Sequence, residues 1–201
     1  INPLRSNYVS EKVNLQDKNV IDVACGGGLL VEALNKFGAK VTGIDISDVA
    51  INTAQIHAEK TNCDVTYIHG EAEDLLPEKK ETFDVVTCLE AIEHVPDPQQ
   101  LVKTCSDLCK PGGTIVFSTI NRNPKSFLFA IIGAEYILNL LPKGTHEFKK
   151  FLKPSELSNM MRNSNLEVKE IIGMSYNPLT KKYWLGKDVD VNYMIHAEKS
   201  K

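Results

Sequence analysis

The sequence predicts a single α/β domain, in which a mostly parallel sheet carries helices on both faces. Short β-branched segments alternate with helical patterns between residues 19 and 119, the order of elements found in parallel sheets. A chain of 201 residues suits one hydrophobic core. It also lacks internal repeats and low-complexity stretches. We therefore expect one domain over residues 1–201.

The first part of the chain is expected to supply five strands. Residues 19–23 form the first strand and lead into a helix over 29–37. A second strand over 41–45 precedes a helix that Ser47 can cap and that runs to about residue 62. A helix after Pro98 and a tight turn at 110–113 precede the fifth strand. The other three strands are predicted at 65–69, 83–88 and 114–119.

Beyond residue 121 the pattern changes. Residues 122–153 are apolar and basic, which marks an insertion after the fifth strand. Pro154 then opens a short helix at its first turn. Residues 166–174 and 191–198 are expected to form a closing pair of strands, for a total of seven.

Charge and cysteine content exclude some functions. The formal net charge is -3 without long blocks of one sign, so no global field favours nucleic acid, and we expect no such partner. The five cysteines are odd in number, lack zinc-site spacing and lie mostly in apolar segments. Reduced thiols are the expected state.

A glycine-rich turn follows the first strand. The segment Asp22-Val-Ala-Cys-Gly-Gly-Gly28 opens a helix, so its backbone can approach a ligand and its N–H groups can meet an anion. The dinucleotide fingerprint needs a third glycine where Val31 stands, which disfavours a bound pyrophosphate. The turn instead resembles the D/E-x-G-x-G-x-G loop of class I methyltransferases, which bind S-adenosyl-L-methionine. Ala24 and Gly26 are the predicted contacts, and Ala24 is expected to fit only with negative φ.

Asp45 ends the second strand about 20 residues after this loop. An acidic side chain there can accept both hydroxyls of an adenosine ribose. Asp45 could instead cap the following helix, but Ser47 is better placed to do so. Asp45 is therefore predicted to bind the cofactor.

Resemblance to class I methyltransferases implies further cofactor contacts. An acidic residue followed by alanine after the third strand contacts the adenine edge in that class, which corresponds to Glu71 and Ala72. Arg5 matches a position near the carboxylate of the cofactor, and Leu89 one that lines it beside the fourth strand.

Acidic residues and a histidine follow the fourth strand, where ligands bind in open α/β sheets. If this segment is helical, Glu90, Glu93 and His94 stand at i, i+3 and i+4 on one face. Two crowded carboxylates favour a cation between them. Mg²⁺ suits them, and one imidazole would also admit Zn²⁺ or Mn²⁺. The alternative is an ordinary polar loop.

Several blocks resemble the ubiquinone biosynthesis O-methyltransferases along essentially the whole chain. The blocks are Cys88-Leu-Glu-Ala-Ile-Glu-His-Val-Pro-Asp-Pro98, Ser118-Thr-Ile-Asn-Arg-Asn123, Gly133-Ala-Glu-Tyr-Ile-Leu138, Pro142-Lys-Gly-Thr-His146, Tyr176-Asn-Pro178 and Val189-Asp-Val-Asn-Tyr193. The resemblance implies a Rossmann-like class I methyltransferase fold, with a mostly parallel seven-stranded sheet.

The same resemblance implies an activity. The expected reaction is S-adenosyl-L-methionine-dependent methylation of a ring hydroxyl of a polyprenylated catechol and of a demethylated quinol, with a divalent metal on Glu90, Glu93 and His94. A catechol that chelates such an ion loses a proton more readily, so the metal can replace much of a general base. No catalytic residue is assigned. Asn121 and His146 are equally consistent with the pocket and with loop hydrogen bonds.

The insertion allows two interpretations. Residues 126–141 are strongly apolar, carry only Glu135 as an acid and are flanked by basic residues. The segment is too short and interrupted to span a bilayer, but it suits a membrane interface, where a prenyl tail would also lie. A lid or a dimer contact is the alternative. The resemblance implies a cytoplasmic protein, peripheral on the inner membrane in a bacterium or on its matrix side in a eukaryote, with other ubiquinone-biosynthesis proteins as possible partners. The flanking basic residues are Arg122, Lys125, Lys143, Lys149, Lys150 and Lys153.

Two other functions fit the sequence less well. An NAD-dependent oxidoreductase would be favoured by a third loop glycine and a proton donor for a carbonyl, and neither is visible. A non-catalytic membrane scaffold would be favoured by loss of Asp45 or of the acidic pair, and both are present.

Overall fold

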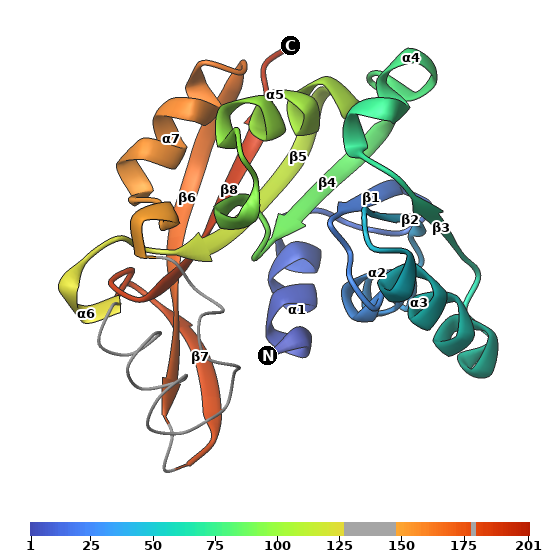
Figure 1. Ribbon diagram of the computed structural model, residues 1–201, viewed down its shortest axis with the longest axis horizontal. Coiled ribbons are helices and arrows are strands. Elements are labelled where there is room, and N and C mark those ends of the chain that lie inside the picture. The colour runs from blue at the N-terminus through green and yellow to red at the C-terminus, as the bar shows by residue number, and fades with distance from the viewer. Residues whose placement is uncertain (127–147, 178–179) are drawn as a thin grey trace.

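The computed structural model is an eight-stranded sheet with helices on both faces (Figure 1). It describes residues 1–126, 148–177 and 180–201. The strand order is β3-β2-β1-β4-β5-β8-β6-β7. Strands β1 to β5 are parallel, β8 is antiparallel to β5 and β6, and β7 is antiparallel to β6. The strands are β1 (Asn19–Val23), β2 (Lys40–Asp45), β3 (Val65–His69), β4 (Phe83–Leu89), β5 (Cys109–Ile120), β6 (Leu166–Asn177), β7 (Lys182–Gly186) and β8 (Asn192–Lys199).

Helices fill most of the connections. Ser47 caps α3 by accepting a hydrogen bond from the Ala50 backbone N–H at 3.3 Å, and Pro154 stands in the first turn of α7. Both features agree with the sequence prediction. The helices are α1 (Asn2–Lys12), α2 (Leu29–Asn35), α3 (Asp48–Thr61), α4 (Leu76–Lys79), α5 (Pro98–Leu108), α6 (Pro124–Ser126) and α7 (Pro154–Arg162), with 3₁₀ turns η1 (Ala72–Leu75), η2 (Ile92–His94) and η4 (Phe148–Lys150).

The predicted α/β fold is confirmed, with differences in detail. The sheet gains β7, because β6 continues past Met174 and turns back as a hairpin. The segment Lys110–Gly113 lies inside β5, where the register to β4 shifts between Phe83 and Val85. Gly113 is required there, since a Cβ atom would lie 2.6 Å from the Cys109 sulfur. The predicted insertion follows β5, and its residues 127–147 lie outside the described part of the chain.

Two hydrophobic cores lie on opposite faces of the sheet. One packs α5 and α7 against residues such as Val86 and Phe117, and the other packs α1 and α2 against residues such as Val85 and Val116. The alternation along β4 and β5 sends successive side chains to opposite faces, so both faces of these central strands are buried. All five cysteines are free, and four of them are buried.

The fold brings five strand ends to one edge of the sheet. Because β1 to β5 are parallel, their carboxyl ends lie together, and β8 begins there because Asn192 pairs with Ile120. The β6–β7 hairpin starts at the same edge and projects beyond the neighbouring strands (Figure 1). Within the described helices, no segment has both the length and the apolarity needed to cross a membrane.

Candidate active site

The glycine loop connects β1 to α2 at this carboxyl edge. Gly26 and Gly28 have positive φ of 53° and 77°. A Cβ atom on Gly26 or Gly27 would meet nothing within 4 Å, so the loop faces open space, whereas one on Gly28 would collide with the Tyr67 hydroxyl at 2.1 Å. The loop therefore leaves the backbone of Gly26 and Gly27 accessible.

Ala24 differs from its prediction. Its φ is +58° rather than negative, in the left-handed region that a Cβ atom disfavours. Its neighbour Cys25 donates its backbone N–H to the carbonyl oxygen of Ile44 on β2 at 3.0 Å. We infer that the tight turn into this contact imposes the left-handed conformation at Ala24. The side chain is exposed at the loop surface.

Asp45 joins the loop to the end of β2. Its Oδ2 accepts the Gly26 backbone N–H at 2.8 Å, and its Oδ1 accepts the Ser47 N–H at 2.8 Å. The carboxylate is half-buried, and each oxygen retains a lone pair for a further donor. Asp45 therefore fixes the loop conformation, and its remaining lone pairs are available to a ligand.

Asp22 lies beneath the loop and is nearly fully buried. Burial raises the pKa of its carboxyl to about 7, although the hydrogen bond from the Thr87 hydroxyl, at 2.6 Å to Oδ1, opposes the rise. The side chain links β1 to β4, the strand that leads to Glu90. This acid therefore ties the end of β1 to β4.

Glu71 and Ala72 occupy different environments. Glu71 is exposed at the start of η1, where it forms a reciprocal capping box with Asp74, and Ala72 is buried in the core. Ile46, which the sequence analysis did not single out, is 72% exposed directly after Asp45. An exposed apolar side chain at this position is available to pack against a ligand. The signal for Ile46 in the sequence was its position next to Asp45.

Arg5 and Glu90 form an ion pair at the end of β4. Arg5 projects from α1, and its Nη2 lies 2.5 Å from Glu90 Oε1. Glu90 Oε1 also accepts the Ser118 hydroxyl at 2.8 Å, and the amide of Asn192 donates to both Glu90 oxygens at 3.0 Å. Leu89, the residue before Glu90, is partly buried against the core that α1 covers. Arg5 thus contacts the predicted metal site.

Glu93 is buried on the other side of this edge. Its Oε2 accepts the Thr119 hydroxyl at 2.8 Å, and Oε1 has no hydrogen-bond partner among the described residues. Burial, and then the nearby charge of Glu90, raise the pKa of Glu93 to about 7. A buried carboxylate oxygen without a partner is costly, so this position favours a ligand that supplies a donor or a cation.

The single helical face expected for Glu90, Glu93 and His94 does not form. Glu90 directly follows β4 with a left-handed φ of 56°, and the 3₁₀ turn begins only at Ile92. His94 is exposed while Glu93 is buried. In the part of the chain that the structure describes, no group of three or more His, Cys, Asp or Glu side chains could hold a metal ion.

The sequence allows two roles for Asn121 and His146, and the structure describes only Asn121. Asn121 is buried and donates its amide to the carbonyl oxygen of Val189 at 2.9 Å, which is a loop hydrogen bond. His146 lies outside the described residues.

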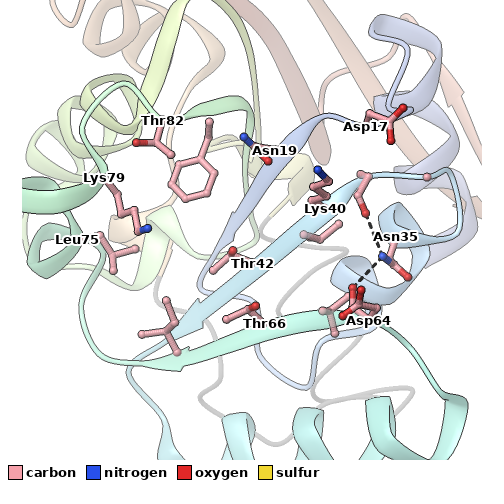
Figure 2. Close-up of a pocket in the computed structure, with 16 residues that line it drawn as sticks. Asp17, Asn19, Asn35, Lys40, Thr42, Asp64, Thr66, Leu75, Lys79 and Thr82 are labelled. Carbon is pink, nitrogen blue, oxygen red and sulfur yellow. Dashed lines mark hydrogen bonds between the residues drawn. The ribbon is translucent and has the colours of Figure 1, made fainter.

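A cavity of about 670 Å³ lies at the opposite edge of the sheet (Figure 2). Its walls include Asn19, Lys40 and Thr82, at or beside the amino ends of β1, β2 and β4. None of the predicted site residues lines it. Ligands of open α/β sheets bind at the carboxyl ends of the strands, so this cavity is separate from the candidate active site.

Comparison with known proteins identifies the family of this chain. Residues 5–171 match a family described as a methyltransferase domain. The chain is 58% identical over 197 residues to a ubiquinone biosynthesis O-methyltransferase of Pseudomonas syringae pv. tomato, covering 98% of this chain and 85% of that protein. It is 56% identical to one of the same name from Marinobacter nauticus, covering 98% and 84%.

A solved structure has the same fold at low sequence identity. The magnesium protoporphyrin IX methyltransferase of Synechocystis PCC 6803, with bound SAH, matches with a TM-score of 0.73 and 18% identity, covering 99% of this chain and 82% of that one. This likeness shows the fold of the chain.

Proposed function

This chain belongs to the ubiquinone biosynthesis O-methyltransferase family, and we propose that it methylates a ring hydroxyl of a prenylated catechol or demethylated quinol with S-adenosyl-L-methionine. One observation carries the proposal. The glycine loop and Asp45 lie at the carboxyl ends of β1 and β2, and the adjacent strand β4 delivers Glu90 to the same edge. The cofactor and the acceptor would therefore lie next to each other at this edge of the sheet.

The protein contributes mainly by aligning the cofactor with the acceptor, rather than by forming a covalent intermediate. An oxygen lone pair of the acceptor forms the new C–O bond, the methyl–sulfur bond breaks, S-adenosylhomocysteine leaves, and the hydroxyl proton passes to an acceptor. The residues at the loop would fix the sulfonium, and the polar residues around Glu90 would orient the hydroxyl for in-line displacement. No side chain is assigned as the base.

We also propose that a divalent metal ion assists the reaction. The two carboxylates fit this role better than the histidine does. Glu90 and Glu93 would hold the ion, and the support is the buried Glu93 oxygen without a partner beside a second carboxylate. A bound divalent ion would lower the pKa of a catechol hydroxyl. Arg5 already pairs with Glu90, so a metal must compete with this guanidinium.

Removal of metal ions with a chelator tests metal assistance separately from the methyltransferase activity. If a metal assists, catechol methylation falls in EDTA and returns with Mg²⁺, whereas affinity for S-adenosylhomocysteine is unchanged. Glu90→Gln keeps the size of the side chain but removes a charge, so it should reduce methylation while thermal unfolding stays cooperative. Full activity of metal-stripped enzyme would contradict metal assistance and leave the methyltransferase assignment intact.

A membrane surface is the proposed partner, since a prenylated acceptor partitions into lipid. Support comes from the β6–β7 hairpin, where Tyr176, Tyr183 and Trp184 are exposed. Aromatic and basic side chains together suit an anionic lipid interface. On the insertion itself, Arg122 and Lys125 are paired with acids, which reduces their contribution. The hairpin lysines without an ion pair in the described part of the chain are Lys181, Lys182 and Lys187.

Flotation with phosphatidylcholine vesicles, with and without phosphatidylglycerol, tests the membrane proposal. Deletion of residues 126–141 and the substitution Trp184→Ser should each reduce binding to the anionic vesicles. Ile56→Ser is the matched control, because Ile56 is 53% exposed on α3 and Trp184 is 47% exposed. Equal flotation of all four proteins would overturn the proposal and favour a lid or a dimer contact.

Mass spectrometry of the products tests the function. Incubation with S-adenosyl-L-methionine should add one methyl group to a catechol and, more rapidly, to its prenylated analogue. Calorimetry with S-adenosylhomocysteine and NAD separates the oxidoreductase alternative, which requires NAD binding. Cofactor binding without any methylated product would instead favour a non-catalytic scaffold.

A further inference from the structure

We propose that Asn192 is an acceptor-binding residue, whose Oδ1 accepts a hydrogen bond from the ring hydroxyl adjacent to the one that is methylated. This inference rests on the proposed function and names the group that recognises two neighbouring hydroxyls. Asn192 is the first residue of β8, at the carboxyl edge of the sheet, opposite Ile120 of β5 and Met174 of β6.

The orientation of the Asn192 amide follows from its partner. Its Nδ2 lies 3.0 Å from both Oε1 and Oε2 of Glu90, and an ionised carboxylate only accepts hydrogen bonds. The nitrogen must therefore face Glu90. The amide oxygen Oδ1 is buried and has no partner among the residues that the structure describes.

A second buried atom without a partner belongs to Arg5, which pairs with the same carboxylate. Arg5 donates through Nη2 to Glu90 Oε1, but its Nε–H is buried without a partner in the described chain. Buried polar atoms without partners are rare, and the two beside Glu90 indicate a place for a polar ligand.

The two orphan atoms beside Glu90 match the chemistry of a catechol. Asn192 Oδ1 is an acceptor, and the catechol hydroxyl that is not methylated is an O–H donor. Arg5 Nε–H is a donor, and each catechol oxygen also has lone pairs. A phenol without this second hydroxyl leaves Asn192 Oδ1 unpaired. A site built to bind a hydroxyl rejects the analogue that lacks it for this reason.

Asn192 also donates hydrogen bonds to Glu90, so its binding of a hydroxyl has to be distinguished from a purely structural role. Ser118 provides the matched control. Its hydroxyl donates to Glu90 Oε1 at 2.8 Å and is fully buried, but it leaves no orphan acceptor. Ser118→Ala therefore removes support from Glu90 without removing the proposed hydroxyl contact.

The experiment compares kcat/KM for a catechol and for the matching phenol that lacks the adjacent hydroxyl. Wild-type enzyme should prefer the catechol. Asn192→Ala should lower the catechol-to-phenol ratio by about tenfold, since one hydrogen bond is lost with the catechol and none with the phenol. Ser118→Ala should lower both values by the same factor and leave the ratio unchanged. Affinity for S-adenosylhomocysteine and thermal unfolding are measured for each protein.

The outcomes separate this inference from the proposed function. An unchanged ratio in Asn192→Ala, or an equal fall in Ser118→Ala, overturns the role of Asn192 while methylation itself stands. Absence of methylation of either compound by wild-type enzyme contradicts the proposed function. If Asn192→Ala does not fold, Asn192→Ser is measured in the same way, with the same loss of ratio expected.

Discussion

Two residues at the candidate active site, Ala24 and Glu90, have left-handed backbone conformations without being glycine. Such conformations cost free energy and persist where surrounding contacts impose them. For Glu90, those contacts are the hydrogen bonds of its backbone N–H to the Ser118 carbonyl at 3.0 Å and hydroxyl at 3.2 Å. The conformation turns Glu90 away from a helical path and toward Arg5.

Ala24→Gly should stabilise the protein. Glycine adopts positive φ without steric cost, so the substitution should raise the free energy of unfolding by about 1 kcal/mol and Tm by about 2–4 °C. Thermal unfolding followed by circular dichroism measures this. Ala50→Gly, in helix α3, is the contrast and should destabilise by about 1 kcal/mol. A lower Tm for Ala24→Gly would contradict strain at this residue.

Asp45→Asn should weaken binding of S-adenosylhomocysteine by at least about tenfold. The amide keeps the size of the side chain but loses one acceptor oxygen, so either the loop contact to Gly26 or the ribose contact is lost. Titration calorimetry gives the affinity. The control is Asp48→Asn in the first turn of α3, which lies three residues away and makes no contact with the loop in the described hydrogen bonds. Equal affinity of both variants would show that Asp45 does not bind the cofactor.

At the scale of elements, α1 connects the outer strands to the active site. Glu170 of β6 accepts the Tyr8 hydroxyl at 2.7 Å and pairs with Lys12 at 2.6 Å, and these contacts lower the pKa of its carboxyl. The same helix carries Arg5 to Glu90. The position of Arg5 therefore depends on how firmly the C-terminal half of α1 is held.

Glu170→Gln should loosen α1. The exposed charge pair is worth only about 0.5–1 kcal/mol, so we expect faster amide exchange in α1 and about threefold weaker binding of S-adenosylhomocysteine, with little change in Tm. Hydrogen exchange read by mass spectrometry measures the first effect. Glu167→Gln is the matched control, since Glu167 lies on the same strand and pairs with Lys169 instead. Faster exchange throughout the protein, rather than in α1, would exclude this connection.

At the scale of the whole molecule, the sheet contains a buried ionisable group, Asp22 on β1. Asp22 ionises in the unfolded chain near pH 3.8, and burial raises its pKa to about 7 in the folded protein. Between these values the folded state binds the proton more strongly. The folded protein therefore loses stability from this group as pH rises from about 4 to about 7.

Asp22→Asn should remove this loss. Asparagine keeps an oxygen for the Thr87 hydroxyl but does not titrate, so the variant should gain up to about 4 kcal/mol relative to wild type between pH 4 and pH 7. Urea unfolding across this range measures the difference. A constant difference between the two proteins at all pH values would contradict the raised pKa.

Asp84 provides a contrast of opposite sign. Partial burial opposes its ionisation, but hydrogen bonds from Lys110 and the Asn19 N–H outweigh this and lower its pKa. Its contribution to stability is present above the unfolded pKa near 3.8 and is lost as pH falls through the lower folded value. Asp84→Asn should therefore be less stable than wild type near neutral pH, and the deficit should shrink in acid.

The sequence by itself determined the features that depend on neighbouring residues. The periodicity of β1 to β4, the cap at Ser47 and the glycine loop are local patterns, and each lies where the sequence predicted. The family followed from motifs of this kind. The hairpin strand β7 was missed because its exposed aromatic and basic residues show no alternation between apolar and polar positions.

Tertiary structure alone decided how the polar residues meet at the active site. Arg5 and Asn192 lie 85 and 102 residues from Glu90, and only the sheet order β1-β4-β5-β8 brings their elements to one edge. The helical spacing of Glu90, Glu93 and His94 was misleading, because long-range hydrogen bonds to Ser118 hold Glu90 out of the helix. Contacts between distant segments depend on strand order and register, which no local pattern encodes.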